Sequence, residues 1–168
     1  MLDTVVSFTG HRMQSLPFGE HSPEMDGIKF RLYQESRALM EQGCTEFLCG
    51  MAQGIDLIAA EQVIRLKRSL FPAVQLIAVQ PYPDFTRQWS FSWKRRYESV
   101  LLWCSQCKNI AQTYDPGVNH RRDLYLASHC GRLIAVFNGD YATGTGYMIL
   151  HAKRLGVEVT IIPVPKVR

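Results

Sequence analysis

The amino-acid sequence predicts a single Rossmann-like α/β domain over residues 1–168, with a mostly parallel sheet of about six strands and helices on both faces. Short apolar segments rich in β-branched residues alternate with longer segments of helical period. Parallel strands require crossover connections, so this alternation favours a parallel sheet. The length suits one domain that buries its own core, and no repeat, low-complexity tract or linker divides the chain.

The strands are predicted from short apolar runs that are bounded by glycine, proline or polar residues. The first run has the sequence TVVSFT, and the fifth has the sequence RLIAVF. In chain order, the predicted strands span residues 4–9, 46–49, 74–79, 109–113, 132–137 and 158–162. The stretch at 80–88 carries two prolines and is expected to be a loop within the domain.

The helices are predicted between these strands, near residues 24–42, 55–69, 87–103, 119–129 and 145–155. In the first helix, Met25, Ile28 and Leu32 recur at three- and four-residue spacing, which places them on one helical face. Gly43 and Gly156 stand where the end of a helix favours a residue in the left-handed conformation.

The composition excludes several classes of protein. Lys and Arg number 19 against 15 Asp and Glu, so the formal net charge is +4, and 46% of the residues are apolar. Such a chain is too apolar and too weakly charged to be disordered. No segment reaches the roughly 18–20 consecutive apolar residues of a membrane span, and the first residues lack the basic start of a signal peptide. We therefore expect a soluble cytoplasmic protein without a membrane partner, whose small positive charge is compatible with anionic ligands.

The five cysteines are an odd number, which fits reduced thiols better than a disulfide framework. Cys104 and Cys107 form a lone CxxC pair. A structural zinc site usually needs a second pair of ligands, for which His120, His129 and Cys130 are the candidates. We interpret the pair as ordinary thiols beside a helix end and expect no metal.

The loop after the first strand contains Gly10, His11 and Arg12. Ligands of parallel sheets bind beyond the carboxyl ends of the strands, so this loop is a candidate ligand contact. Gly10 allows the backbone to turn sharply and approach a ligand, and Arg12 offers a two-pronged contact to phosphate. A basic turn with its side chains in water is the alternative interpretation.

The loop after the second strand contains Gly50, Ala52 and Gly54 and leads into a helix. Backbone amides at the start of a helix lie at the positive end of its dipole and often bind phosphate. The loop matches neither the Walker A motif nor the GxGxxG fingerprint. We interpret Asp56 as a helix cap, with a contact to a ribose hydroxyl as the alternative.

The loop after the fifth strand, residues 138–146, contains three glycines and two threonines and again precedes a helix. Gly144, Thr145 and Gly146 offer N–H and O–H donors. Because the three glycine-bearing loops lie at the same predicted edge of the sheet, we expect them to converge on one anion or nucleotide.

Two further stretches are candidates to close this site. Trp89 would stack on a base, although helical packing explains most of the neighbouring aromatic residues more simply. Arg121 and Arg122 either bind phosphate or begin a solvated helix. Residues 65–68 and 94–96 are basic runs that are typical of exposed helix faces.

The motifs TGHR, CGMAQGIDLIAAE, YDPG with HRR, and LIAVFNG with GTGY follow one another in this order. Together they resemble the YpsA-like branch of the SLOG superfamily, from about Val5 to Ile162. That superfamily also includes the LONELY GUY phosphoribohydrolases and the Rossmann part of the DNA-processing protein DprA. The resemblance implies a Rossmann-like fold and a nucleotide or nucleotide-derived ligand held by these loops. The glycine-rich segment of DprA, which is similar to the second loop, contacts single-stranded DNA.

The ligand-binding positions implied by this resemblance are Gly10, His11, Arg12, Gly50, Ala52, Gly54, Asp56, Gly144 and Thr145. LONELY GUY enzymes carry a catalytic glutamate in a motif similar to the third loop, and Met148 stands at that position here. Thr143 also replaces a glycine that YpsA-like proteins tend to have. Cleavage of an N-glycosidic bond needs a carboxylate, for which Asp56 and Asp140 are the nearest candidates.

We therefore predict a non-catalytic sensor or regulatory module that binds a nucleotide-like ligand such as NAD, ADP-ribose or a nucleoside monophosphate. One alternative is a nucleoside 5′-monophosphate phosphoribohydrolase, which would use the phosphate site and the two aspartates. Another is a DprA-like binder of single-stranded DNA, which the second loop and the positive charge favour. A homodimer is compatible with a domain of this size.

Overall fold

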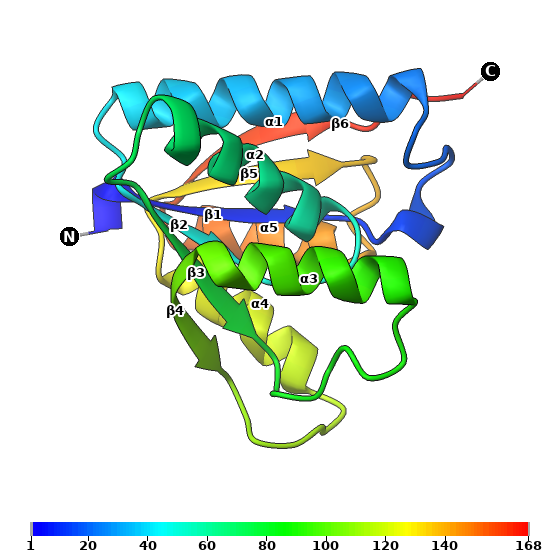
Figure 1. Cartoon of the computed structure of the whole chain (residues 1–168). Coiled ribbons are helices and arrows are strands. Elements are labelled where there is room, and N and C mark those ends of the chain that lie inside the picture. Colours follow the sequence, from blue (N-terminus) through cyan, green and yellow to red (C-terminus); the bar gives the residue numbers. More distant parts are fainter. Residues whose placement is uncertain (1, 168) are drawn as a thin grey trace.

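The computed structural model describes residues 2–167 and shows a sheet that lies between two groups of helices (Figure 1). Its strands are β1 (Val5–Gly10), β2 (Glu46–Cys49), β3 (Gln75–Gln80), β4 (Cys104–Asn109), β5 (Arg132–Phe137) and β6 (Glu158–Pro163). They are ordered β4-β3-β2-β1-β5-β6, and every adjacent pair is parallel. The predicted Rossmann-like α/β fold is confirmed, with a sheet that is parallel throughout.

The helices connect successive strands and divide between the two faces of the sheet. They are α1 (Pro23–Glu41), α2 (Ile55–Ser69), α3 (Phe91–Trp103), α4 (Val118–Ser128) and α5 (Gly144–Arg154), with short 3₁₀ helices η1 (Leu2–Thr4) and η2 (Met13–Ser15). Helices α1, α2 and α3 pack side by side on one face, and α4 packs against α5 on the other. The chain runs from β1 outward to β4 and then returns to the other side of β1, where β5 and β6 follow. Because each crossover is right-handed, this reversal of direction places the later helices on the opposite face of the sheet.

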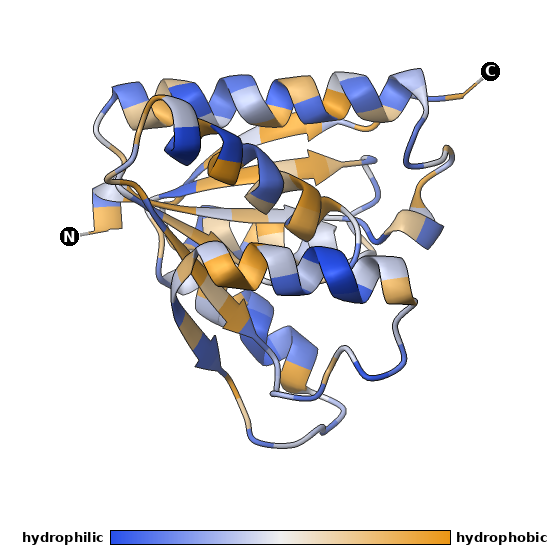
Figure 2. Ribbon diagram, in the orientation of Figure 1, coloured by the Kyte–Doolittle hydropathy of each residue, from blue (hydrophilic) through white to orange (hydrophobic). Residues whose placement is uncertain are grey.

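The core follows the predicted periodicity of α1, because Met25, Ile28 and Leu32 are all buried. They belong to the larger of the apolar clusters, which fills the space between the sheet and α1–α3. A second cluster, which includes Leu126 and Met148, lies under α4 and α5. Figure 2 shows the same pattern, with helices of mixed polarity over strands that are largely apolar except at β4. Each large buried side chain contributes about 1.5–3 kcal/mol, so the two layers hold the strand ends in fixed positions.

The fourth strand departs from the prediction, which placed it at 109–113. Strand β4 spans Cys104–Asn109, follows α3 directly, and has the polar sequence CSQCKN. It is an edge strand that pairs with β3 alone, and a register irregularity at Leu76/Ile77 interrupts that pairing. Because most of its side chains are exposed, the apolar run that identifies buried strands is missing from it. The preceding helix also begins at Phe91 rather than near residue 87, with the Ser90 side chain accepting a hydrogen bond from the Trp93 amide.

The cysteines of the CxxC pair occupy the junction between α3 and β4. Cys104 is the C-cap of α3, as expected for a thiol beside a helix end, whereas Cys107 lies exposed within the edge strand. Burial raises the pKa of Cys104 to about 12, with the neighbouring Cys107 adding to the rise. Within residues 2–167, no group of three or more His, Cys, Asp or Glu side chains is arranged to hold a metal ion.

Strands β1 and β5 form the switch point of the sheet. They are neighbours, yet the chain leaves β1 toward β2 and leaves β5 toward β6, in opposite directions. The loops beyond these two strands therefore separate and leave a crevice between them.

Candidate ligand-binding site

A pocket of about 500 Å³ opens at this switch point, at the carboxyl ends of the strands. It is lined by Phe8, Thr9, Gly10, His11, Arg12, Ser15, Ala52, Asp56, Pro116, Asn119, His120, Arg122, Asp123, Leu126, Asn138, Thr143, Gly144 and Thr145. Residues from all three glycine-bearing loops thus border one cavity. The lining does not include four other candidate residues from the sequence, namely Gly50, Gly54, Gly146 and Arg121.

Gly10 ends β1 at the point where α2 packs onto the sheet. A Cβ atom at this position would lie 2.3 Å from Cγ2 and 2.4 Å from Cβ of Ile55, the first residue of α2. The glycine is therefore required by helix–strand packing, in addition to its place in the pocket lining.

His11 is buried and is held by the loop after β5. Its Nε2 accepts a hydrogen bond of 3.1 Å from the Asn138 amide, and its ring stacks on Phe137. Burial lowers the pKa of His11, and the charge of Asp140 opposes this only in part. The ring is thus neutral near pH 7, with the proton on Nδ1 because Nε2 acts as an acceptor.

Arg12 is the exposed cation of the pocket. It lines the main cavity and a smaller adjoining one, and its side chain makes no ion pair or hydrogen bond within residues 2–167. A guanidinium without a carboxylate partner keeps all its donors available for an anion.

Gly54 is the residue before α2, and its φ of +101° is a conformation that side-chain-bearing residues rarely adopt. A Cβ atom there would lie 2.8 Å from the Met13 amide nitrogen and 2.9 Å from the His11 carbonyl oxygen. The loops after β1 and β2 consequently meet backbone to backbone. Met51, a buried residue in the same loop, also has a positive φ of 64°, so strain is concentrated beside the pocket.

Asp56 does not cap α2, contrary to the preferred interpretation. The N-cap residue is Gly54, and the Asp56 carboxylate instead accepts a hydrogen bond of 3.3 Å from the Ala52 amide. Asp56 is the second residue of α2, and its side chain points back across the loop to Ala52 and borders the cavity. Burial raises the pKa of Asp56 to about 6, although Arg122 and the Ala52 amide both favour the carboxylate.

Arg122 extends from α4 into the floor of the pocket. Its Nη1 donates 2.8 Å to the Gly50 carbonyl, and its Nε donates 3.0 Å to Asp123. Burial disfavours the charge, but Asp123 and Asp56 outweigh it and raise the pKa of Arg122. A Cβ atom at Gly50 would lie 2.8 Å from Asp56 Oδ2 and 3.2 Å from Arg122 Cδ, so this glycine makes room for these two buried side chains.

Arg121 has a different role from its neighbour in sequence. It forms a two-pronged ion pair with Asp115, at 2.8 and 2.6 Å, outside the cavity. Arg122 therefore lines the pocket, whereas Arg121 holds the turn that precedes α4. Sequence reasoning pointed to the start of this helix but singled out only its two arginines, whereas Asn119 and His120 also line the cavity. The HRR motif and the preceding proline–glycine turn were the available signals for a helix that begins at the site.

The loop after β5 is organised by Thr143, the N-cap of α5, whose Oγ1 accepts from the Gly146 amide. Gly144 has no atoms within 4 Å of the position of a Cβ, and it opens onto the cavity beside the buried Thr145. A Cβ atom at Gly146 would lie 2.5 Å from the Tyr141 Cα, so this residue packs against its own loop. Asp140 accepts a hydrogen bond from the Ala142 amide and lies outside the lining.

A smaller cavity of about 190 Å³ adjoins the pocket and shares Arg12, Ala52, Asn119 and Arg122 with it. Its remaining walls are Gln53, Tyr82, Phe85 and Trp89. Trp89 stands edge-on to Phe85 and Tyr97, with ring centroids 5.3 and 6.0 Å apart. The ring is thus packed in an aromatic cluster and also borders this annex, although it lies before α3 and not within a helix as the simpler interpretation held.

Three helices begin at the pocket. Asp56 lies in the first turn of α2, Asn119 in that of α4, and Gly144 starts α5. Their positive dipole ends converge on one cavity together with the unpaired Arg12, which makes the site suited to an anion.

The fold and this pocket define a Rossmann-like protein with a crevice at the switch point of a parallel sheet, where three helices begin. Residues 6–161 match the family model YpsA, described as the YspA SLOG family, and the chain belongs to this family. The resemblance noted in the sequence motifs is confirmed.

Relatives of this chain are found in several bacteria. A UPF0398 protein of Halalkalibacterium halodurans is 27% identical over 153 residues, which cover 89% of this chain and 80% of that protein. A UPF0398 protein of Bacillus pumilus is 24% identical over 152 residues, covering 89% and 81%. One of Enterococcus faecalis is 26% identical over 148 residues, covering 86% and 82%.

Among solved structures, the chain is similar to DNA processing protein A of Helicobacter pylori, a protein described by its single-stranded DNA binding mode. The TM-score is 0.62 at 15% sequence identity, and the match covers 95% of this chain and 65% of that one. The chain thus spans slightly less than two thirds of that protein, and the similarity shows a shared fold. None of the helices in residues 2–167 has the length and apolar character to cross a membrane.

Proposed function

We propose that this protein binds a nucleotide or nucleotide-derived phosphate ligand in the switch-point pocket and acts as a non-catalytic sensor or regulatory module. The observation that carries the proposal is the convergence of three helix N-termini on a cavity that holds Arg12 without an acidic partner. Phosphate groups are favoured at such a position by both the amide donors and the dipoles.

The annex supports a ligand that carries a base as well as phosphate. It joins the main cavity through Arg12 and Asn119 and adds the rings of Tyr82, Phe85 and Trp89. A phosphate near the helix starts and a flat ring beside these aromatic side chains would use both cavities. NAD, ADP-ribose and nucleoside monophosphates all have this combination of groups.

The carboxylates of the site support a binding role over catalysis. Asp56 accepts from the Ala52 amide, and Asp123 accepts from Arg122, so both are engaged in holding the pocket together. Asp140 is outside the lining. Met148, at the position where the LONELY GUY enzymes carry their catalytic glutamate, is buried in the apolar cluster under α5.

Thermal unfolding with AMP, ADP, NAD and ADP-ribose tests the proposal. A ligand at 100 times its Kd stabilises the folded state by about 2.7 kcal/mol, which raises the Tm by roughly 5–10 °C for a chain of this size. Arg12→Ala removes the free cation and should weaken the binding at least about tenfold. Arg37→Ala is the matched control, because Arg37 pairs with Glu41 on the outside of α1. The proposal fails if none of these nucleotides raises the Tm, or if Arg12→Ala binds as tightly as the control.

A second candidate function is hydrolysis of the N-glycosidic bond of a nucleoside monophosphate. The raised pKa of Asp56, about 6, lies in the range suited to a general acid or base, and its side chain borders the pocket. Incubation with AMP should then release free adenine. Asp56→Asn should abolish the release, whereas the control Asp140→Asn should retain it. Absence of turnover at high enzyme concentration rejects this candidate.

Single-stranded DNA is a further ligand to test at the same pocket, because the similar DNA processing protein is described by binding it. An oligonucleotide held there would compete with AMP and would lose affinity in Arg12→Ala. Binding of an oligonucleotide without binding of any small nucleotide would favour DNA as the ligand of the pocket.

A further inference from the structure

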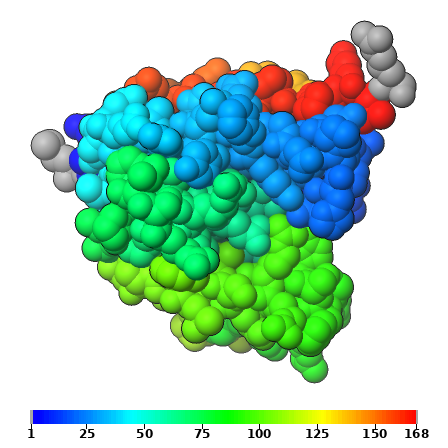
Figure 3. Space-filling view, turned by 45° about the horizontal axis from the view of Figure 1, so that its top comes forward, coloured from blue at the N-terminus to red at the C-terminus, as the bar shows by residue number. Residues whose placement is uncertain are grey.

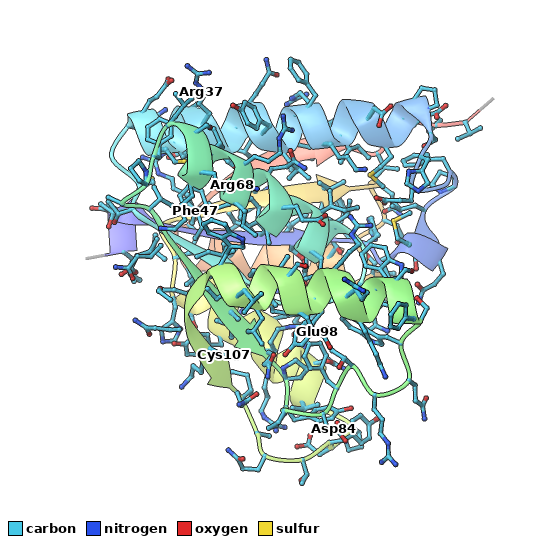
Figure 4. All side chains as sticks on the ribbon, viewed as in Figure 1. Arg37, Phe47, Arg68, Asp84, Glu98 and Cys107 are labelled. Atoms are coloured by element: carbon cyan, nitrogen blue, oxygen red, sulfur yellow. The ribbon has the colours of Figure 1, made fainter. Side chains whose placement is uncertain are left out.

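Two arginines and two aromatic rings form a row across the outer face of α1, α2 and α3, and we term it the arginine–aromatic row. Its members are Tyr33, Arg65, Arg68 and Trp103. The two arginines belong to α2, and each neighbouring helix supplies one ring. Helix α2 packs against both α1 and α3, and the colours of Figure 3 show residues of these parts of the chain in adjoining areas of one face. Figure 4 labels Arg68 on α2.

The contacts within the row are cation–π contacts. The guanidinium of Arg65 lies 5.0 Å from the centroid of the Tyr33 ring, and that of Arg68 lies 5.6 Å from the centroid of the Trp103 ring. Both arginines are exposed, and their three-residue spacing places them next to each other on α2. The rings orient the guanidinium groups without neutralising their charge.

The charges of the row are not balanced by carboxylates. Neither Arg65 nor Arg68 has an acidic partner within residues 2–167, and Arg65 donates only to Gln62, at 3.0 Å. Arg96 of α3 provides the contrast, because it lies between Glu20 and Glu61 at 2.9 and 2.5 Å. The expectation that the basic run at 94–96 is a plain exposed face is thus wrong for Arg96. The run at 65–68 does present two free cations.

The surface at this row is hollowed. A shallow groove of about 400 Å³ lies here, bordered by Tyr33, Arg65, Arg68 and Ser69. A groove with exposed guanidinium donors and an adjacent, partly exposed Trp103 ring offers a phosphate contact beside a stacking surface. Bases are free to stack on side chains only where a nucleic acid is unpaired. Recognition of an anionic membrane surface usually relies on a cluster of about four to eight basic side chains, and the row supplies two arginines.

We propose that the arginine–aromatic row binds single-stranded nucleic acid. Arg65 and Arg68 contact successive phosphates, and Trp103 stacks on a base. The row uses the second halves of α1 and α2 and the end of α3, whereas the ligand pocket lies where α2, α4 and α5 begin. The two sites share no residue, so the proposal stands independently of the function proposed for the pocket.

Fluorescence anisotropy with a labelled oligothymidylate of about 20 nucleotides, long enough for one site, tests this proposal. At low salt the native protein should bind it, and the affinity should fall steeply as salt is added. The double substitution Arg65→Gln/Arg68→Gln should weaken binding at least about tenfold and should lower the slope of log affinity against log salt by about 1.4. Trp103→Ala should weaken binding at least about fivefold while leaving most of the salt dependence.

Two controls make the outcome decisive. Lys153→Gln/Arg154→Gln removes two exposed charges from α5, on the other face of the sheet, and should change the affinity less than about twofold. Arg12→Ala should likewise retain oligonucleotide binding while it loses any nucleotide of the pocket. The proposal is overturned if the native protein does not bind at low salt, or if both double substitutions weaken binding equally. It is also overturned if Arg12→Ala alone abolishes binding, or if vesicles of anionic lipid bind through the two arginines and the oligonucleotide does not.

Discussion

The loops after β2 and after β5 look alike in sequence, since each places glycines before a helix at the same edge of the sheet. In the first loop the glycines make room for the protein itself. A Cβ atom at Gly54 would meet the backbone of the loop after β1, and one at Gly50 would meet Asp56 and Arg122. In the second loop, Gly144 faces open space at the pocket.

The difference shows that a glycine-rich loop can serve either packing or ligand access. The β2 loop fastens the start of α2 against β1, which sets the rigid side of the pocket. The β5 loop exposes backbone to the cavity, with Thr143 fixing the start of α5. A methyl group added at Gly50 or Gly54 should therefore affect stability, and one added at Gly144 should affect ligand binding.

Gly54→Ala should have the largest effect. It combines a φ of +101° with backbone contacts of 2.8 and 2.9 Å that cannot give way. Strain and overpacking together should lower the free energy of unfolding by about 4 kcal/mol. Chemical denaturation measures this change. If stability falls by less than about 1 kcal/mol, the β2 loop is not the rigid side of the pocket.

Gly10→Ala should come next, at about 3 kcal/mol, because its Cβ would overlap the Ile55 side chain rather than backbone. The double substitution Gly10→Ala/Ile55→Ala removes the overlapping atoms. It should cost less than the sum of the two single changes, which a double-mutant cycle in denaturant would measure. Strict additivity would show that the clash does not determine the effect.

The pH dependence of the free energy of unfolding tests the buried Asp56. The expected effect is smaller than that of Gly10→Ala and larger than that of Gly144→Ala. Its pKa rises from the ordinary 3.8 to about 6 in the folded state, so between these values the folded protein holds a proton that the unfolded chain has lost. Stability from this group therefore increases as the pH falls from 7 toward 4, by about 2 kcal/mol. His11 acts in the opposite direction, since its pKa is lowered.

Asp56→Asn isolates this contribution, because His11 is the same in both proteins. The variant should be more stable than the native protein at pH 7 and should lose that advantage near pH 4. Urea titrations at several pH values would show it. Parallel pH profiles for the two proteins would mean that Asp56 titrates normally.

Gly144→Ala should have the smallest effect on folding. The added methyl group enters open space at the first residue of α5, so stability should stay the same or increase by about 0.5 kcal/mol. Because that space belongs to the pocket, the affinity for a nucleotide should fall. Titration calorimetry on the variant and on Gly54→Ala would separate the two roles. Unchanged affinity would place the ligand away from α5.

Most of the fold was predictable from the sequence, because buried parallel strands and amphipathic helices have distinct apolar periods. The run RLIAVF and the spacing of Met25, Ile28 and Leu32 both became core elements. Strand β4 was placed too far along the chain, since the period disappears where a strand lies at an edge and its side chains face water.

The sequence indicated which loops carry the candidate site, because strand order along the chain already places their ends at one edge of a parallel sheet. It could not assign individual side chains. Arg121 and Arg122 are adjacent in sequence, yet one pairs with Asp115 outside the cavity and the other lies beneath the pocket. Asp56 matched the residue preference of a cap but accepts from Ala52 instead.

The class of fold, the family and the three loops follow from the order of the residues, because local periodicity and short motifs lie along the chain. The packed structure is needed to show which glycines face protein atoms and which face the cavity, and that α2, α4 and α5 begin at one pocket. It also brought Tyr33 and Trp103 to the arginines of α2. Such contacts join residues far apart in the chain, and the packing of helices on the twisted sheet fixes them.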